Sequence, residues 1–312
     1  MAVTQLHAEL VLQVRNDTGE CPVWQAQEQA LYWVDIPEKT LHRYQLQSGA
    51  HTLWSAPQML GCIAPSVAPG QWIAGAQSGF FALDASRDDV LGFAPLQTAS
   101  HAMPGMRFND GRCDRQGRFM AGSMLIDMLA ARDVGCIYQL QHDGVLHKLL
   151  DGFVTPNGMA FSPDGTKMYL TDSHKSVRKS WVYDYDTERG LPSNPRAFID
   201  MGGFAGRPDG AAMDSDGCYW ICGIDAGLVH RYTPAGVLDM TISVPVTKPS
   251  MCAFGGADLR TLYMTSISPT VAADQRPMDG GLFAIHLPRV QGQPEPVCTT
   301  PLSAVPGSSE PI

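Results

Sequence analysis

Four segments far apart in the chain begin with an oxygen-bearing side chain where a strand would favour Val or Ile. They read GECPVW, RFNDG, TPNGM and RPDGA, and they supply Glu20, Asn109, Asn157 and Asp209. Asn-Gly and Asp-Gly are also ordinary turn dipeptides. The residues alone therefore allow two interpretations, which are local turn chemistry or a set of carboxylate and amide oxygens that the fold brings to one place.

The chain contains an internal repeat that bears on this choice. An apolar, often aromatic segment occurs six times after a turn, as LYWVDI, WIAGA, RFMAGS, KMYLTDS, CYWICG and TLYMTS, with starts separated by 41, 46, 49, 51 and 43 residues. Turns such as Asp-Gly between alternating runs favour hairpins, and no segment has a long helical period. A four-stranded unit repeated six times predicts an all-β, six-bladed β-propeller.

The two ends of the chain have separate predicted places. The N-terminal segment AELVLQV belongs to no repeat, and it is predicted to complete the last blade beside GGLFAIHL, which would remove an exposed strand edge. Residues 1–288 are predicted to form a single propeller domain. Residues 289–312 form a Pro-rich tail that is unsuited to a central strand and is expected to lie over the surface.

In a propeller the innermost strands begin around one mouth of the central channel. Aligning the repeats puts six residues at this opening position, namely Glu20, Cys62, Asn109, Asn157, Asp209 and Ser250. Two carboxylates and two amides there suit a divalent cation such as Ca²⁺, Mg²⁺ or Mn²⁺. No Gly follows Glu20, so turn chemistry does not explain that residue. No His is in the set, which disfavours Zn²⁺.

Composition restricts the class of protein. The 312 residues are 44% hydrophobic and 17% charged, with a net charge of −9, so a large core is expected and nucleic acid is not an expected partner. No apolar run is long enough to span a membrane, and no secretory signal is evident, which together predict a cytoplasmic protein. The eight cysteines form no CxxC pair and are expected to be reduced, buried thiols.

The motifs GECPVW, RFNDGRCDRQGRFMAGSM, PNGMAFSPDG with YLTDS, and PDGAAMDSDG resemble the senescence-marker-protein/gluconolactonase family, also called the regucalcin family. The resemblance runs from about Gly19 to Ser266. It implies a six-bladed propeller with one divalent metal at the channel mouth. It also implies hydrolysis of a sugar-acid lactone, an aldonic or aldaric acid lactone, in carbohydrate catabolism.

The resemblance also implies roles for particular residues. Glu20, Asn157 and Asp209 resemble the family's metal ligands, and Asp209 also resembles its proposed general base. Arg107 and Asn109 resemble residues that hold substrate hydroxyls, although Arg107 pairing with Asp110 is an alternative. Asp127 falls where the family often has a Glu that contacts the sugar. Ca²⁺ is the favoured cation, with Zn²⁺, Mn²⁺, Mg²⁺ and Fe²⁺ as alternatives.

Three functions remain open at this stage. The first is a metal-dependent lactonase with a small-molecule sugar lactone as its partner; the second is a calcium-binding propeller without turnover; the third is an interaction scaffold. A monomer or small homo-oligomer is expected. The segment His174–Lys179 is the densest basic stretch and is predicted to overhang the mouth, where it would favour an anionic lactone unless it is merely a solvated loop.

Overall fold

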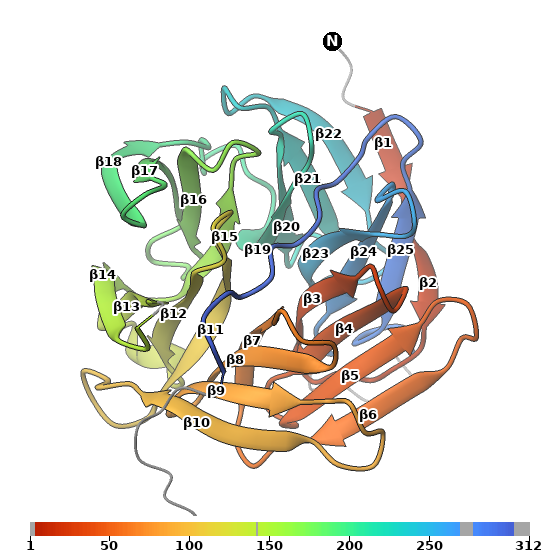
Figure 1. Cartoon of the computed structure of the whole chain (residues 1–312). Helices are drawn as coiled ribbons and strands as arrows, with labels where there is room; N and C mark the ends of the chain where they lie inside the picture. Colours follow the sequence, from red (N-terminus) through yellow and green to blue (C-terminus); the bar gives the residue numbers. More distant parts are fainter. Residues whose placement is uncertain (1–3, 142, 269–276, 303–312) are drawn as a thin grey trace, which may run out of the picture.

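In the computed structural model, which describes residues 4–141, 143–268 and 277–302, six sheets surround a central axis (Figure 1). Blades 1 to 3 comprise β3 (Gly19–Gln25), β4 (Ala30–Asp35), β5 (Thr40–Gln45) and β6 (His51–Ser55); β7 (Leu60–Pro65), β8 (Gln71–Ala76), β9 (Gly79–Asp84) and β10 (Gly92–Thr98); and β11 (Met106–Cys113), β12 (Phe119–Leu125), β13 (Gly135–Leu140) and β14 (Leu146–Phe153).

Blades 4 to 6 complete the ring. They comprise β15 (Pro156–Phe161), β16 (Lys167–Asp172), β17 (Lys179–Asp186) and β18 (Leu191–Ala197); β19 (Arg207–Met213), β20 (Tyr219–Ile224), β21 (Leu228–Tyr232) and β22 (Leu238–Ser243); and β23 (Pro249–Gly255), β24 (Thr261–Ser266) and β25 (Leu282–His286). The described residues contain no α-helix, only the 3-10 turn η1 (Met128–Ala130). The predicted all-β, six-bladed propeller is confirmed.

The N-terminal segment closes the ring as predicted. Strand β2 (Glu9–Leu12) pairs antiparallel with β25 and supplies the fourth strand of blade 6. The sequence did not indicate a second contact, in which β1 (Thr4–His7) pairs parallel with β22 and adds a fifth strand to blade 5. The N-terminus therefore joins two neighbouring blades and covers the edge of each.

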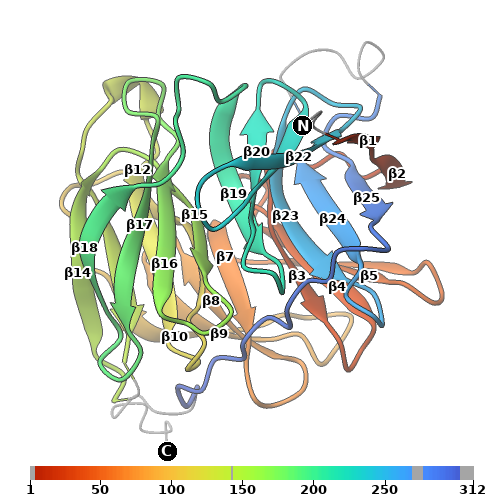
Figure 2. The same ribbon diagram turned by 90° about the horizontal axis from the view of Figure 1, so that it is seen from above.

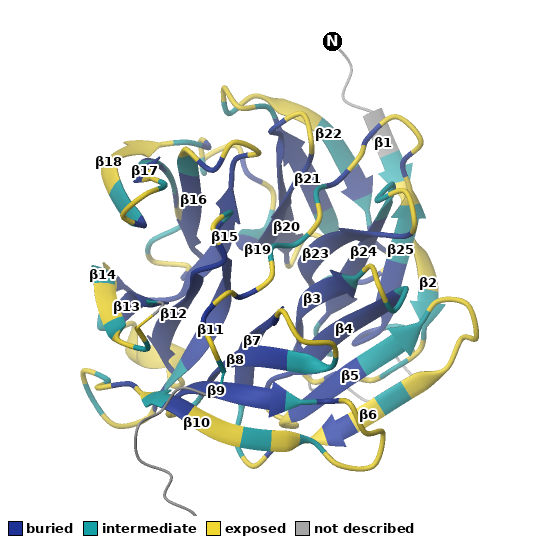
Figure 3. Cartoon of the chain, viewed as in Figure 1, coloured by how far each residue is buried: buried dark blue, intermediate teal, exposed yellow. Residues whose placement is uncertain are grey.

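The core lies between the blades and under their inner strands (Figure 3). The innermost strands are almost completely buried, whereas outer strands such as β18 are largely exposed. Large aromatic side chains fill the space between neighbouring sheets; Tyr32 of blade 1 packs against Trp72 of blade 2, with ring centroids 4.3 Å apart. Each blade therefore depends on its neighbours for burial of its faces.

Aspartates stabilise the turns between the first and second strands of blades 3 and 5, that is, between β11 and β12 and between β19 and β20. The Oδ1 atom of Asp114 accepts hydrogen bonds from the backbone N–H groups of Gln116 and Arg118, both at 2.9 Å. Asp214 accepts from Asp216 and Cys218 in the same way in blade 5. These carboxylates explain why the turn-rich sequence folds into tight hairpins at these points.

The C-terminal tail crosses the end of the channel at which the innermost strands finish (Figures 1 and 2). Gly292 N–H donates to Leu259 of blade 6, and Cys298 N–H donates to Pro65 of blade 2 at 2.7 Å. The tail carboxylate of Glu295 lies 3.7 Å from the buried Arg112. The described part of the tail therefore joins distant blades, as a surface segment without a central-strand role; residues 303–312 lie outside the described residues.

Two further predictions concerned the state of the cysteines and the absence of a membrane-spanning segment. All eight cysteines are buried and unpaired, as expected for reduced thiols. Among the described residues, no helix has the length and apolar character needed to cross a bilayer.

A stacked pair of histidines in blade 1, buried His42 and exposed His51, makes stability depend on pH. His42 Nδ1 lies 2.9 Å from His51 Nε2, and both rings stack on Trp33. Burial, and then the neighbouring His51, lower the pKa of His42 to about 3, and burial lowers the pKa of His51. Below the unfolded pKa of about 6.5, the unfolded chain takes up protons that the folded protein does not bind.

We therefore expect the free energy of unfolding to fall as the pH falls below about 6.5, by up to about 1.4 kcal/mol per pH unit from the buried His42. Urea unfolding at pH 7.5, 6 and 5 measures this slope. His42→Gln should reduce it, whereas replacing the exposed His147 by Asn should not. Parallel curves for His42→Gln and the parent protein would show that this pair does not set the acid sensitivity.

Candidate active site

Every innermost strand carries one extra residue near its start. From Glu20 to Val23 the chain advances three residues while the partner strand β4 advances two, from Val34 to Tyr32. The same one-residue bulge occurs in β7, β11, β15, β19 and β23. A bulge interrupts pairing and redirects the adjacent side chains. It therefore aims the opening residues into the channel mouth instead of along the sheet.

The structure brings Glu20, Asn109, Asn157 and Asp209 to one pocket of about 210 Å³, as the repeat alignment predicted. Blade 2 differs from that alignment, because its pairs Leu60–Ala76 and Cys62–Gly75 put Gly61 at the opening position. A Cβ on Gly61 would come within 2.3 Å of the Phe108 carbonyl oxygen. Close packing of blade 2 on blade 3 thus leaves no room for a functional side chain there.

A chain of hydrogen bonds links three blades across the pocket. Arg107 Nη1 donates to Asn109 Oδ1 at 2.8 Å, and Asn109 Nδ2 donates to Asn157 Oδ1 at 2.8 Å. Asn157 Nδ2 in turn donates to Asp209 Oδ1 at 2.7 Å and to Ser173 Oγ at 2.7 Å. The amides are therefore positioned by their neighbours, which holds the whole set in place.

Arg107 does not pair with Asp110. Its Nη1 also donates to the Phe108 carbonyl at 2.8 Å, and it forms no salt bridge among the described residues. Asp110 instead accepts from the Met159 N–H at 2.8 Å, below the pocket. Burial lowers the pKa of Arg107 to about 10, so the guanidinium remains charged at neutral pH. A fixed cation is thus available to a bound molecule.

The two pocket carboxylates repel one another in a dry environment. Burial first, then the charges of Asp209 and Asp110, raise the pKa of Glu20 well above its usual value. Burial raises the pKa of Asp209 to about 8, although nearby Arg207 opposes the rise. Buried like charges of this kind need either a proton or a counter-ion.

The donor set fits a divalent cation. One oxygen of each carboxylate, Glu20 Oε1 and Asp209 Oδ2, takes no hydrogen bond from the described residues, while the other oxygens are held by the Cys21 N–H and by Asn157. No group of three or more His, Cys, Asp or Glu among the described residues is placed to hold a metal ion, so a cation here would need other ligands, such as an amide oxygen, as well. Two free carboxylate oxygens beside Asn157 are hard ligands of that type.

The pocket wall contains residues that the sequence analysis did not single out. Two are cations, Arg207 and Lys248, and Ser173 and Thr155 add hydroxyl groups. Met124, Met128, Ile224 and Ile267 supply an apolar part of the wall. A sequence signal existed for the cations, because each lies two residues before an opening residue, as Arg107 does before Asn109.

Two predicted contributors lie elsewhere. Asp127 is exposed, and its carboxylate accepts from the Leu129 N–H at 3.1 Å as the cap of η1, so it does not line the pocket. None of the basic residues of His174–Lys179 lines it either. Arg178 donates to the carbonyl oxygens of Phe204 and Gly206, at 2.9 and 2.8 Å, and thereby anchors a loop of blade 5. Their predicted contacts with substrate remain predictions.

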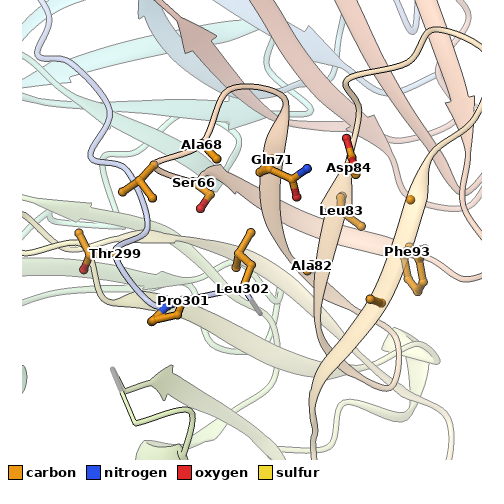
Figure 4. Close-up of a pocket in the computed structure, with 13 residues that line it drawn as sticks. Ser66, Ala68, Gln71, Ala82, Leu83, Asp84, Phe93, Thr299, Pro301 and Leu302 are labelled. Atoms are coloured by element: carbon orange, nitrogen blue, oxygen red, sulfur yellow. The ribbon is translucent and has the colours of Figure 1, made fainter. Parts of the chain in front are cut away.

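A larger cavity than the site pocket, of about 560 Å³, lies at the opposite end of the molecule, between blade 2 and the tail (Figure 4). Leu83, Phe93 and Leu302 give it an apolar wall, and Asp84 is its one titratable residue among the described lining residues. It therefore lacks the convergent polar groups that a catalytic site needs.

The fold and the pocket define a six-bladed propeller with carboxylates and amides at the start of its inner strands. Residues 18–268 match the family described as SMP-30/gluconolactonase/LRE-like region, and the chain belongs to this family, as its motifs indicated.

Relatives cover nearly the whole chain. It is 38% identical over 283 residues to the 6-deoxy-6-sulfogluconolactonase of Pseudomonas putida, covering 89% of this chain and 94% of that protein. It is 35% identical to the L-arabinolactonase of Azospirillum brasilense, covering 88% and 90%. The solved structure of a calcium-binding protein, regucalcin, from Agrobacterium tumefaciens matches with a TM-score of 0.87 at 27% identity, covering 96% of this chain and 99% of that one.

Replacing either carboxylate should remove the predicted cation. Glu20→Gln and Asp209→Asn each delete a charged ligand, so affinity for a divalent cation should fall by at least about tenfold. Elemental analysis and titration calorimetry of the purified variants measure this. Asp127→Asn is the matched control, because it removes a carboxylate near the pocket that does not line it. Unchanged metal content in both pocket variants would refute the site.

Proposed function

We propose that this protein hydrolyses the ester bond of a sugar-acid lactone, an aldonic or aldaric acid lactone, to give the open-chain acid, with the help of a divalent cation. One observation carries the proposal, which is the pair of buried carboxylates, Glu20 and Asp209, beside the guanidinium of Arg107, which forms no ion pair with the described residues. Membership of a family whose relatives are named sulfogluconolactonase and arabinolactonase supports the enzyme class, a lactonase.

Glu20, Asn157 and Asp209 are the proposed ligands of the cation. When bound, a divalent cation supplies Lewis-acid polarisation of the lactone carbonyl. Ca²⁺ is our preferred ion because the donors are all hard oxygens, and the similar structure of a calcium-binding protein supports this choice.

The protein's own residues would then carry the proton and hold the sugar. Asp209, in its ionised form, takes a proton from the attacking water as the new C–O bond forms, since it lies in the pocket and burial raises its pKa to about 8, which makes it a stronger base than an aspartate in water. The ring C–O bond then breaks, and the leaving alkoxide receives the proton that Asp209 took from the water, which restores the Asp209 carboxylate. Arg107 donates to a substrate oxygen, and Asn109 Oδ1 accepts from a sugar hydroxyl, because both residues line the pocket and the Asn109 amide hydrogens are already donated to Pro156 and Asn157. No nucleophilic Ser is required.

Arg107 should matter for substrate more than for the cation. Arg107→Ala should raise KM or lower kcat, with a loss of about tenfold or more in kcat/KM, because a charge-assisted hydrogen bond to the substrate is lost. Metal content measured on the same preparation should stay near the parent value. A loss of metal as complete as that of Asp209→Asn would show that Arg107 supports the cation site instead.

A panel of aldonic and aldaric acid lactones tests the reaction itself. Acid release followed with a pH indicator should exceed the spontaneous rate, fall to it after EDTA treatment, and return when Ca²⁺, Mg²⁺, Mn²⁺ or Zn²⁺ is restored. Heat-treated protein gives the background. If no lactone is opened above background with any of these ions, the lactonase proposal is wrong.

A calcium-binding propeller without turnover is the second candidate. The similarity to the calcium-binding protein of Agrobacterium tumefaciens favours it. A cation buffer has no need, however, for the guanidinium of Arg107 above its carboxylates. The lactone panel separates the two functions, because a buffer binds Ca²⁺ in titration calorimetry and opens no lactone.

A further inference from the structure

A second ring of residues lies outside the opening residues. It consists of the residues two positions earlier in the chain, and in five of the six blades this residue lines the pocket, as Thr18, Arg107, Thr155, Arg207 and Lys248. Residues two apart in an extended chain point to the same side and are separated by about 6–7 Å. The second ring therefore lies toward solvent from the carboxylates and faces the outer part of a bound molecule.

Three members of this outer ring are cations from three blades, although the protein as a whole carries a net charge of −9. Arg207 donates through Nε to Asp225 at 2.6 Å, which leaves its two terminal nitrogens without a hydrogen bond to the described residues. The ammonium group of Lys248 has neither an ion pair nor a hydrogen bond among the described residues. Both side chains are partly exposed.

Ion pairs within the protein do not account well for the positions of Arg207 and Lys248 at the pocket. The Arg207–Asp225 pair is about a third exposed, with side-chain exposures of 32% and 42%, and such pairs contribute little to stability. It does orient the guanidinium toward the pocket. Lys248 has no comparable role, since its charge meets no acid among the described residues. An anion held in the pocket would provide a partner for Lys248 and a second one for the terminal nitrogens of Arg207.

The charge in the deeper ring strengthens this argument. Glu20 and Asp209 are the proposed ligands of a divalent cation, so their two charges are neutralised once it is bound. The wall that remains to meet the substrate then carries Arg107, Arg207 and Lys248. A volume of about 210 Å³ suits one monosaccharide-sized molecule, so a single small ligand would meet both rings at once.

We infer that Arg207 and Lys248, together with Arg107, form a subsite for an anionic group on the substrate, at the end remote from the lactone carbonyl. The substrate class is thus a sugar lactone with a terminal carboxylate or sulfonate. This inference rests on the proposed function and deepens it. It transfers the preference for an anionic lactone from the His174–Lys179 loop, whose basic residues do not line the pocket, to the outer ring.

Three lactones of the same ring size test the subsite with the metal-loaded enzyme. They are glucono-1,4-lactone, glucaro-1,4-lactone and the 6-sulfonate analogue of the first, which differ only at C6. The parent should favour one or both charged lactones by about tenfold or more in kcat/KM, mainly through KM. The stronger of the two identifies the anion.

Charge removal at the outer ring should reduce this preference. In Lys248→Ala and in Arg207→Ala, the ratio of kcat/KM for the charged lactone to that for the neutral one should fall by about tenfold. Lys175→Ala is the matched control, because it removes the same charge from an exposed site on the same end of the propeller and should leave the ratio unchanged. A parent that prefers the neutral lactone, or an equal effect of all three variants, would overturn the subsite.

Binding without turnover separates this inference from the proposed function. D-glucarate differs from D-gluconate by a second terminal carboxylate, so titration calorimetry should show tighter binding of glucarate by about tenfold, lost in Lys248→Ala. If no lactone is opened but this difference is found, the subsite stands and the lactonase proposal fails. If neutral lactones are opened and glucarate shows no advantage, the lactonase proposal stands and the subsite fails.

Discussion

The one-residue bulge at the start of each innermost strand is the constraint on which the site depends. A regular ladder would place alternate side chains against the neighbouring blades, whereas the extra residue breaks the pairing and redirects the chain at the channel mouth. The cost is visible in the backbone, because Cys21 adopts a φ of +49° and Gly158 one of +62°. A Cβ on Gly158 would lie 2.4 Å from the Tyr219 hydroxyl, so only Gly fits there.

The site is destabilising by itself, since it buries Glu20 and Asp209 with like charge. The rest of the molecule offsets this cost at a distance. The N-terminal strands join blades 5 and 6, and the tail ties the opposite end of the channel through backbone hydrogen bonds to several blades. The tail contacts and the proposed chemistry therefore lie at opposite ends of the innermost strands. This separation allows a strained pocket in a well-packed fold.

The pocket is layered by charge along its depth. Carboxylates and amides form the inner ring, and cations from three blades form the outer one. A propeller produces such layers readily, because equivalent positions of several blades face the same channel mouth.

The sequence alone determined the number of blades, the closure by the N-terminal strand and four of the residues that meet in the pocket. These follow from local signals, because turn chemistry, strand alternation and the spacing of repeats all act over a few residues. It placed Cys62 at the mouth, because a one-residue bulge is not visible in a strand pattern. It also overlooked Arg207 and Lys248, although each lies two residues before an opening residue. Only the tertiary structure decided which cations face the pocket. Arg178 and Arg207 are both arginines next to a turn. The Arg178 guanidinium donates to the carbonyl oxygen of Phe204, outside its own blade, whereas the Arg207 guanidinium donates to Asp225 and lines the pocket.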